Sequence, residues 1–254
     1  MIHRLRPALL LLLCLTMPVS AEPPVPLSYL TEAYPPYNYS DDNILRGIAV
    51  DLLISASQHT RQPVSRGEIR LQPWPRAYRT ALNKANTVLF STTRTEEREK
   101  LFKWAGPIAT TRVVLLARKS QRIRIESPAD LQRYRIGTVP DDIGEQLVLA
   151  MGASATQLKH SSNASALAQQ LQAGRIDLWA YEENVAHWFL RNAKLNPDDF
   201  ESVYLLKQGE LWYAFNPQVN DAQVSELQQA IDQLRQLPGR VGKTRYDDIL
   251  LDYL

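Results

Sequence analysis

Short apolar segments alternate with amphipathic helical segments along most of this chain, and this alternation limits its fold more than any other feature. Segment 112–117 is almost wholly apolar, and segment 87–91 has an apolar centre, as expected of buried strands. Segments 48–60 and 164–173 place apolar residues at helical spacing instead. The alternation predicts helices packed on sheets, the α/β class. Because there are more segments than one small sheet holds, we expect two α/β lobes of roughly 100 residues each.

The remaining segments extend this prediction to the end of the chain. We expect further strands at 26–31, 69–72, 135–139, 178–181, 203–206 and 211–215, and further helices at 76–84, 143–151, 184–193, 222–237 and 245–254. A short helix is also expected after Ser127, which can cap it, with Pro128 in its first turn.

The N-terminal segment has the order of a secretory signal peptide. Arg4 and Arg6 precede an apolar run, and small residues follow up to Ala21. The run is too short to cross a bilayer, which needs about 20 apolar residues. We therefore expect residues 1–21 to be removed after Ala21 and the remaining chain to be exported to the periplasm. Cys14, the single cysteine of the chain, lies inside this leader.

The charge balance argues against a polyanion as the partner. The chain has 29 Lys and Arg against 27 Asp and Glu, and the leader carries two of the basic residues. A nucleic-acid-binding protein normally has a basic surplus, so we expect no nucleic-acid partner. No later stretch is long and apolar enough to cross a membrane, so we also expect a protein that is not membrane-embedded.

Four motifs occur in an order that is typical of one protein family. They are TEAYPPYNY at 31–39, GIAVDL at 47–52, STTRTEER at 91–98 with FKWAGPI at 102–108, and GRID at 174–177 followed by Tyr181 and Glu182. With them, the chain resembles the bacterial family 3 extracellular solute-binding proteins over nearly its whole length. The resemblance implies the two-lobed, type II periplasmic binding fold. It places the first lobe at 22–110 and 209–254, the second at 111–208, and a hinge near 108–112 and 207–211.

The resemblance also implies that a small polar ligand is held in the cleft between the lobes. Arg98 matches the arginine that binds the ligand's α-carboxylate, and a guanidinium fits a carboxylate with two parallel hydrogen bonds. Thr93 and Ser91 match positions that help to hold this carboxylate. The alternative is that Arg98 lies on the surface and pairs with Glu97 or Glu99, as exposed arginines commonly do.

An acid and several aromatic side chains complete the expected site. Glu182 matches the acid that accepts the ligand's ammonium, although it could instead only favour the start of the following helix. Tyr34, Tyr37 and Trp74 are candidates for aromatic walls, or alternatively half-buried packing residues. Arg76 is a candidate second contact for an anion.

One loop departs from the family pattern. Where many amino-acid binders have a loop rich in Ser, Thr and Gly, this chain has TVPDDIG at 138–144. Pro140 has no N–H to donate, and Asp141 and Asp142 would repel a carboxylate. Asp142 is thus either a cleft residue or the N-cap of the next helix. A ligand with additional positive or hydroxyl groups is as compatible with this loop as an ordinary α-amino acid.

No catalytic motif accompanies these residues. The histidines after the leader are scattered, and no zinc, nucleophile-elbow or phosphate-loop pattern occurs. We therefore expect a monomeric binding protein with no cofactor and no metal, serving an ABC importer. Two alternatives stay open: a sensor or scavenger without a transporter, and an enzyme similar to cyclohexadienyl dehydratases, in which Glu182 or Asp142 would act as general acid.

Overall fold

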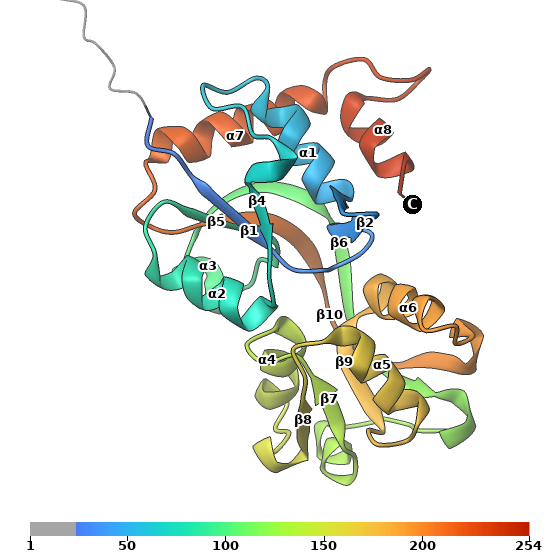
Figure 1. Ribbon diagram of the computed structural model, residues 1–254. Coiled ribbons are helices and arrows are strands. Elements are labelled where there is room, and N and C mark those ends of the chain that lie inside the picture. Colours follow the sequence, from blue (N-terminus) through green and yellow to red (C-terminus); the bar gives the residue numbers. More distant parts are fainter. Residues whose placement is uncertain (1–23, 254) are drawn as a thin grey trace, which may run out of the picture.

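The structure is a computed structural model that describes residues 24–253. The expected leader and Cys14 lie outside the described residues. A single eight-stranded sheet runs through the molecule in the order β4-β1-β5-β10-β6-β9-β7-β8. Two strands of 16 residues, β6 (Lys103–Arg118) and β10 (Phe200–Phe215), pair antiparallel at its centre. Figure 1 shows these two strands running between two groups of elements, which we call the first and second lobe.

The first lobe contains both ends of the described chain. Its elements are β1 (Ser28–Thr31), the hairpin β2 (Tyr39–Asp41) and β3 (Ile44–Arg46), α1 (Ile48–Ser57), β4 (Ile69–Leu71), α2 (Trp74–Asn83), β5 (Thr87–Thr93), α3 (Glu96–Glu99), α7 (Asp221–Leu234) and α8 (Arg245–Leu251). The strands β1, β4 and β5 are parallel. Every residue of β5 is buried, including the apolar Val88, Leu89 and Phe90 at its centre.

The second lobe repeats this arrangement on a smaller scale. Its elements are β7 (Ile136–Thr138), α4 (Ile143–Ala150), β8 (Leu158–His160), α5 (Ala164–Gln172), β9 (Leu178–Glu182) and α6 (Glu183–Asn192). The strands β7, β8 and β9 are parallel. The prediction of an α/β protein with two lobes is confirmed.

The apolar core is continuous across the lobe interface on one face of the sheet. A single cluster of buried side chains extends from the first lobe to Trp179, Tyr181 and the helices α5 and α6. A separate cluster, which includes Leu115, Ile136 and Val148, fills the opposite face of the second lobe. Side chains of the two lobes therefore pack directly against each other where the continuous cluster crosses the interface.

Several predicted elements have different limits in the structure. The expected strands 203–206 and 211–215 are one strand, β10, and the expected strand 112–117 belongs to β6, which begins at Lys103. The two long strands hydrogen-bond each other along their length, and irregularities in the pairing occur as shifts of register. The expected helix after Ser127 is a 3₁₀ helix, Pro128–Arg133.

Candidate functional site

The carboxyl ends of parallel strands from both lobes meet at the interface between them. Glu32 directly follows β1, Thr93 ends β5, Thr138 ends β7 and Glu182 ends β9. In open α/β sheets, ligands bind beyond the carboxyl ends of the strands. The lobe interface is therefore the place to look for a binding site.

Direct contacts hold the two lobes together at this interface. The Tyr37 hydroxyl donates a hydrogen bond to Glu182 Oε1 at 3.2 Å. The rings of Tyr34 and Tyr181 meet edge to face, with centroids 5.6 Å apart. Trp74 Nε1 donates to the backbone carbonyl of Asp141 at 2.9 Å. In each pair one residue belongs to the first lobe and the other to the second, so the lobes are closed on each other.

Arg98 lies inside this interface rather than on the surface. Its side chain is 1 % exposed, and Nη1 and Nη2 donate to the carbonyls of Thr93 and Asp141 at 3.2 and 3.3 Å. The guanidinium carbon lies 5.5 Å from the ring centre of Trp74 and 5.1 Å from that of Tyr78. Nε has no hydrogen-bond partner among residues 24–253. The alternative in which Arg98 is an exposed, paired residue is wrong.

The loop that departs from the family pattern reaches the first lobe through a backbone carbonyl. Asp141 has a left-handed φ of 62°, and its carbonyl accepts hydrogen bonds from Trp74, Arg98 and Gln146. Asp142 occupies the N-cap position of α4 and is 4 % exposed. Its Oδ2 finds no hydrogen-bond partner in the described chain. Asp142 is thus both the N-cap residue of α4 and a buried acid whose Oδ2 accepts no hydrogen bond from residues 24–253.

Three carboxylates and three tyrosines from both lobes form one buried group, the acid–tyrosine cluster: Glu32, Tyr34, Tyr37, Asp142, Tyr181 and Glu182. Burial raises the pKa of Glu182 to about 7. Burial also raises the pKa of Asp142, against the opposing charge of Arg98. Burial and then the nearby Asp142 charge raise the pKa of Glu32. The Tyr181 hydroxyl, like Asp142 Oδ2, has no partner within residues 24–253.

The two carboxylate oxygens of Glu182 have different partners. One carboxylate oxygen, Oε2, accepts from the Val185 amide at 2.7 Å and so caps α6. The other, Oε1, meets the Tyr37 hydroxyl of the opposite lobe. The side chain therefore starts a helix and faces the lobe interface at once.

The other predicted residues are only partly brought together. Trp74 is buried and stacks on Tyr78 with ring centres 5.5 Å apart. Ser91 has a left-handed φ of 57° and donates a hydrogen bond to Asn38 Oδ1. Arg76 is exposed, and its side chain forms no hydrogen bond or ion pair with any residue between 24 and 253.

Sequence reasoning missed Glu32, Asn38, Tyr78 and Tyr181. Glu32 had a usable signal, because it directly follows the first predicted strand, where site residues of α/β proteins gather. Tyr181 also lies at the end of a predicted strand and was noticed only as part of a motif. Tyr78 and Asn38 gave no such signal. Tyr78 packs beside Arg98, and Asn38 forms hydrogen bonds with the Glu32 backbone and with Ser91.

Two cavities flank the lobe interface. One of about 220 Å³ is lined by Tyr78, Arg98, Ile143 and Gln146 with their neighbours. A groove of about 510 Å³ opens on the other side, between Glu32 and Pro73 of the first lobe and Asn163, Ala164 and Phe189 of the second. Both are lined by residues of both lobes, and each has a site residue, Arg98 or Glu32, in its wall.

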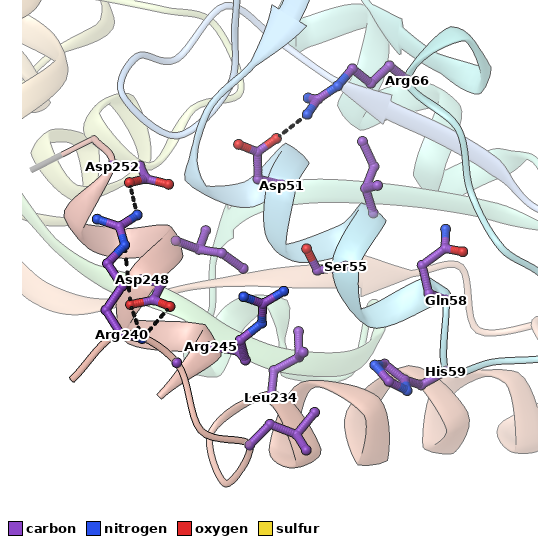
Figure 2. Close-up of a pocket in the computed structure, with 14 residues that line it drawn as sticks. Asp51, Ser55, Gln58, His59, Arg66, Leu234, Arg240, Arg245, Asp248 and Asp252 are labelled. Carbon is purple, nitrogen blue, oxygen red and sulfur yellow. Dashed lines mark hydrogen bonds and ion pairs between the residues drawn. The ribbon is translucent and has the colours of Figure 1, made fainter. Parts of the chain in front are cut away.

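A larger cavity, of about 880 Å³, lies within the first lobe between α1, the end of α7 and α8. Figure 2 shows that charged side chains in its wall pair with one another. Asp51 binds Arg66 at 2.7 Å, and Arg240 binds Asp248 and Asp252. This cavity is not at the carboxyl ends of the strands, so we do not assign the ligand site to it.

Glu182 makes the stability of the protein depend on pH. Its pKa rises from 4.5 to about 7 on folding, so the folded state binds the proton more tightly. The resulting stabilisation is complete below about pH 4.5 and is lost as the pH rises through 7. We expect the difference in Tm between the wild type and Glu182→Gln to move in favour of the wild type as the pH falls from 7.5 to 5.

Thermal unfolding of the two proteins across this pH range is the measurement. Glu126→Gln is the matched control, because Glu126 is an exposed acid. Its Tm should follow the wild type at every pH. Parallel curves for the wild type and Glu182→Gln would show that Glu182 does not titrate in this range.

Two further findings concern the described helices and acids. None of the helices between residues 24 and 253 combines the length and apolar character that crossing a membrane requires. Within the same residues, no three His, Cys, Asp or Glu side chains are grouped as ligands of a metal ion.

Comparison with known proteins places the chain in a family. No curated protein matches it by sequence. An ancestral arginine-binding protein bound to arginine is 21% identical, with a TM-score of 0.73 over 90% of this chain and 97% of that one. A histidine kinase sensor domain similar to periplasmic binding proteins is 17% identical, with a TM-score of 0.77 over 92% and 98%.

The arginine-, lysine-, histidine-binding protein ArtJ of Geobacillus stearothermophilus is 16% identical, with a TM-score of 0.68 over 89% of this chain and 95% of ArtJ. At these identities the structures share the fold. The sequence model of the bacterial extracellular solute-binding proteins, family 3, matches residues 28–237, which is most of the chain. The chain therefore belongs to the bacterial extracellular solute-binding proteins, family 3.

Proposed function

We propose that this protein captures an amino acid or a related small polar compound between its lobes and delivers it to an ABC importer. The observation that carries this proposal is a set of buried polar atoms at the interface that have no partner among residues 24–253: Arg98 Nε, Asp142 Oδ2 and the Tyr181 hydroxyl. A buried polar atom without a hydrogen bond costs about 1–3 kcal/mol, and a charged one costs more. A polar ligand in the cleft would remove these costs.

The proposal assigns roles to most of the predicted residues. Arg98 binds a carboxylate of the ligand through the N–H groups that face the cleft, and Glu182 receives its ammonium. Tyr34, Tyr37 and Trp74 enclose the ligand, while Thr93 and Ser91 shape the wall behind it. The lobes, 22–110 with 209–254 and 111–208, open and close about 108–112 and 207–211, where β6 and β10 run from one to the other.

Export to the periplasm belongs to the same proposal. The basic, apolar and small-residue order of residues 1–21 supports a signal peptide that is cleaved after Ala21. We further propose that the protein acts as a monomer.

Two observations favour other uses of the same fold. The similarity to a histidine kinase sensor domain supports a sensor without a transporter. The raised pKa of Glu182, about 7, supports a general acid, as a dehydratase would need. Importer genes beside this one would favour transport, and turnover of prephenate or arogenate would establish an enzyme.

A thermal-shift screen tests the proposal. Amino acids, polyamines, organic acids and small sugars are each added to the purified protein well above their expected Kd. A ligand at 100 times its Kd stabilises the native state by about 2.7 kcal/mol, which in a protein of this size raises Tm by roughly 5–10 °C. We expect such a shift from at least one amino acid or amine. A flat response to every compound would contradict the proposal.

A further inference from the structure

The acid–tyrosine cluster contains more acids than its surroundings neutralise. Glu32, Asp142 and Glu182 are 8%, 4% and 0% exposed, and none of them forms an ion pair with a residue in the described part of the chain. Arg98 is the cation beside them, and two of its nitrogens already donate to backbone carbonyls. A buried carboxylate without a cation or a proton is strongly unfavourable.

Glu32 and Asp142 approach each other only because the lobes are closed. Glu32 follows β1 in the first lobe and lines the groove between the lobes with Asn163 and Phe189. Asp142 begins α4 in the second lobe, and its buried Oδ2 has no hydrogen-bond partner among residues 24–253. The carbonyl of the preceding residue accepts a hydrogen bond from Trp74 of the first lobe, so Asp142 lies at the same lobe interface as Glu32. Besides burial, the charge of Asp142 raises the pKa of Glu32.

We propose that the ligand carries a protonated amine or a guanidinium, besides any α-ammonium at Glu182, and that this group lies between Glu32 and Asp142. This inference rests on the proposed function, because it requires a ligand in the cleft. The cation gives Asp142 Oδ2 its missing partner and cancels the repulsion that closure creates between two acids of opposite lobes. A neutral ligand would leave that repulsion in place.

In the closed protein without ligand, burial raises the pKa of both acids and so favours their protonated forms. The charge of Asp142 raises the pKa of Glu32 further. For Asp142, Arg98 lowers the pKa and Glu145 raises it. Tyr34 and Tyr181 stay neutral, because burial raises their pKa well above the ordinary value. Binding of the cation therefore releases protons from the pair, whereas binding of a neutral ligand does not.

Titration calorimetry with matched pairs of compounds tests this inference. L-Arginine is compared with its neutral isostere L-citrulline, and L-lysine with L-norleucine; putrescine and agmatine are included as cations without a carboxylate. We expect a cationic compound to bind at least about tenfold more tightly than its neutral partner, the usual effect of a hydrogen bond to a charged group. Repeating the titration at pH 6.5 in buffers of different ionisation enthalpy should detect released protons for the cation only.

Variants of the two acids identify the residues responsible. Glu32→Gln and Asp142→Asn keep the side-chain shape and remove the charge, so each should reduce the preference for the cation by at least about tenfold. Glu126→Gln removes an exposed acid and should keep the preference. Because a neutral amide also removes the repulsion, both cleft variants should fold.

Two results would overturn the inference. If the neutral partner binds as tightly as the cation, or if both variants keep the full preference, no cation lies between Glu32 and Asp142. The proposed function would stand in either case, since a ligand still binds. If no compound of the set binds, the inference fails, and the proposed function fails as well only if the wider thermal-shift screen is also flat.

Discussion

Replacing Arg98 by alanine should weaken ligand binding by about 1.5–3 kcal/mol, or roughly tenfold to 150-fold in Kd. The guanidinium is buried, its Nε is without a partner within the described chain, and it lies beside the rings of Trp74 and Tyr78. The alanine variant loses this donor and also the hydrogen bond to the Asp141 carbonyl, which joins the lobes. Isothermal titration with a ligand found in the thermal-shift screen measures the effect.

The chain provides a matched control four residues earlier. Arg94 also lies against aromatic rings, with its guanidinium carbon 4.6 Å from the ring centre of Trp212, but it pairs with Glu99 on the surface. Arg94→Ala should therefore change the affinity less than twofold, a difference of about 0.4 kcal/mol. Arg98→Lys separates charge from shape, because an ammonium keeps the charge and loses the planar fork. Unchanged affinity in Arg98→Ala would remove Arg98 from the site.

Gly47→Ala should destabilise the protein by about 3 kcal/mol, through a backbone strained by the left-handed φ and an overpacked contact. Gly47 precedes α1 with a φ of 122°. A Cβ there would collide with the Tyr37 carbonyl and come within 2.7 Å of the Asn38 nitrogen. The carbonyl cannot retreat easily, since it accepts a hydrogen bond from the Ala49 amide at 2.8 Å. For a chain of this size we expect Tm to fall by roughly 6–12 °C.

The same substitution should also disturb the binding site. The displaced loop carries Tyr34 and Tyr37, which contact Tyr181 and Glu182 of the second lobe. Gly67→Ala is the control, because nothing lies within 4 Å of a Cβ at that position. Its Tm should stay within about 1–2 °C of the wild type, as for an ordinary surface substitution. Equal Tm values for the two variants would mean that the close approach to Tyr37 does not require glycine at position 47.

Sequence reasoning identified some residues of the lobe interface and missed others, for a physical reason. Arg98 and Glu182 were predicted through motifs, and both lie at the lobe interface. Arg76 was a candidate for a second anion contact, but it lies on the exposed face of α2, one residue from the buried Ala77. Glu32 was overlooked although its own motif was recognised, because its importance depends on Asp142, a residue 110 positions away.

Asp141 shows a further limit of sequence reasoning. Its neighbours Pro140 and Asp142 predicted that this loop would not bind a carboxylate. Nothing in the sequence indicated that a left-handed φ would place its carbonyl within reach of Trp74 and Arg98. A backbone carbonyl can accept a hydrogen bond regardless of which side chain its residue carries. Composition and motifs therefore give no sign of such a contact.

The sequence by itself determined the α/β class, the two lobes and the family, because these follow from local hydrophobic period and from short motifs in a fixed order. Tertiary structure alone decided how the strands join and which polar groups meet. Two predicted strands became the single 16-residue strand β10, since pairing with β6 supplies hydrogen bonds along its whole length. The buried acids of two lobes lie at one interface, since only lobe closure brings together residues that are far apart in the chain.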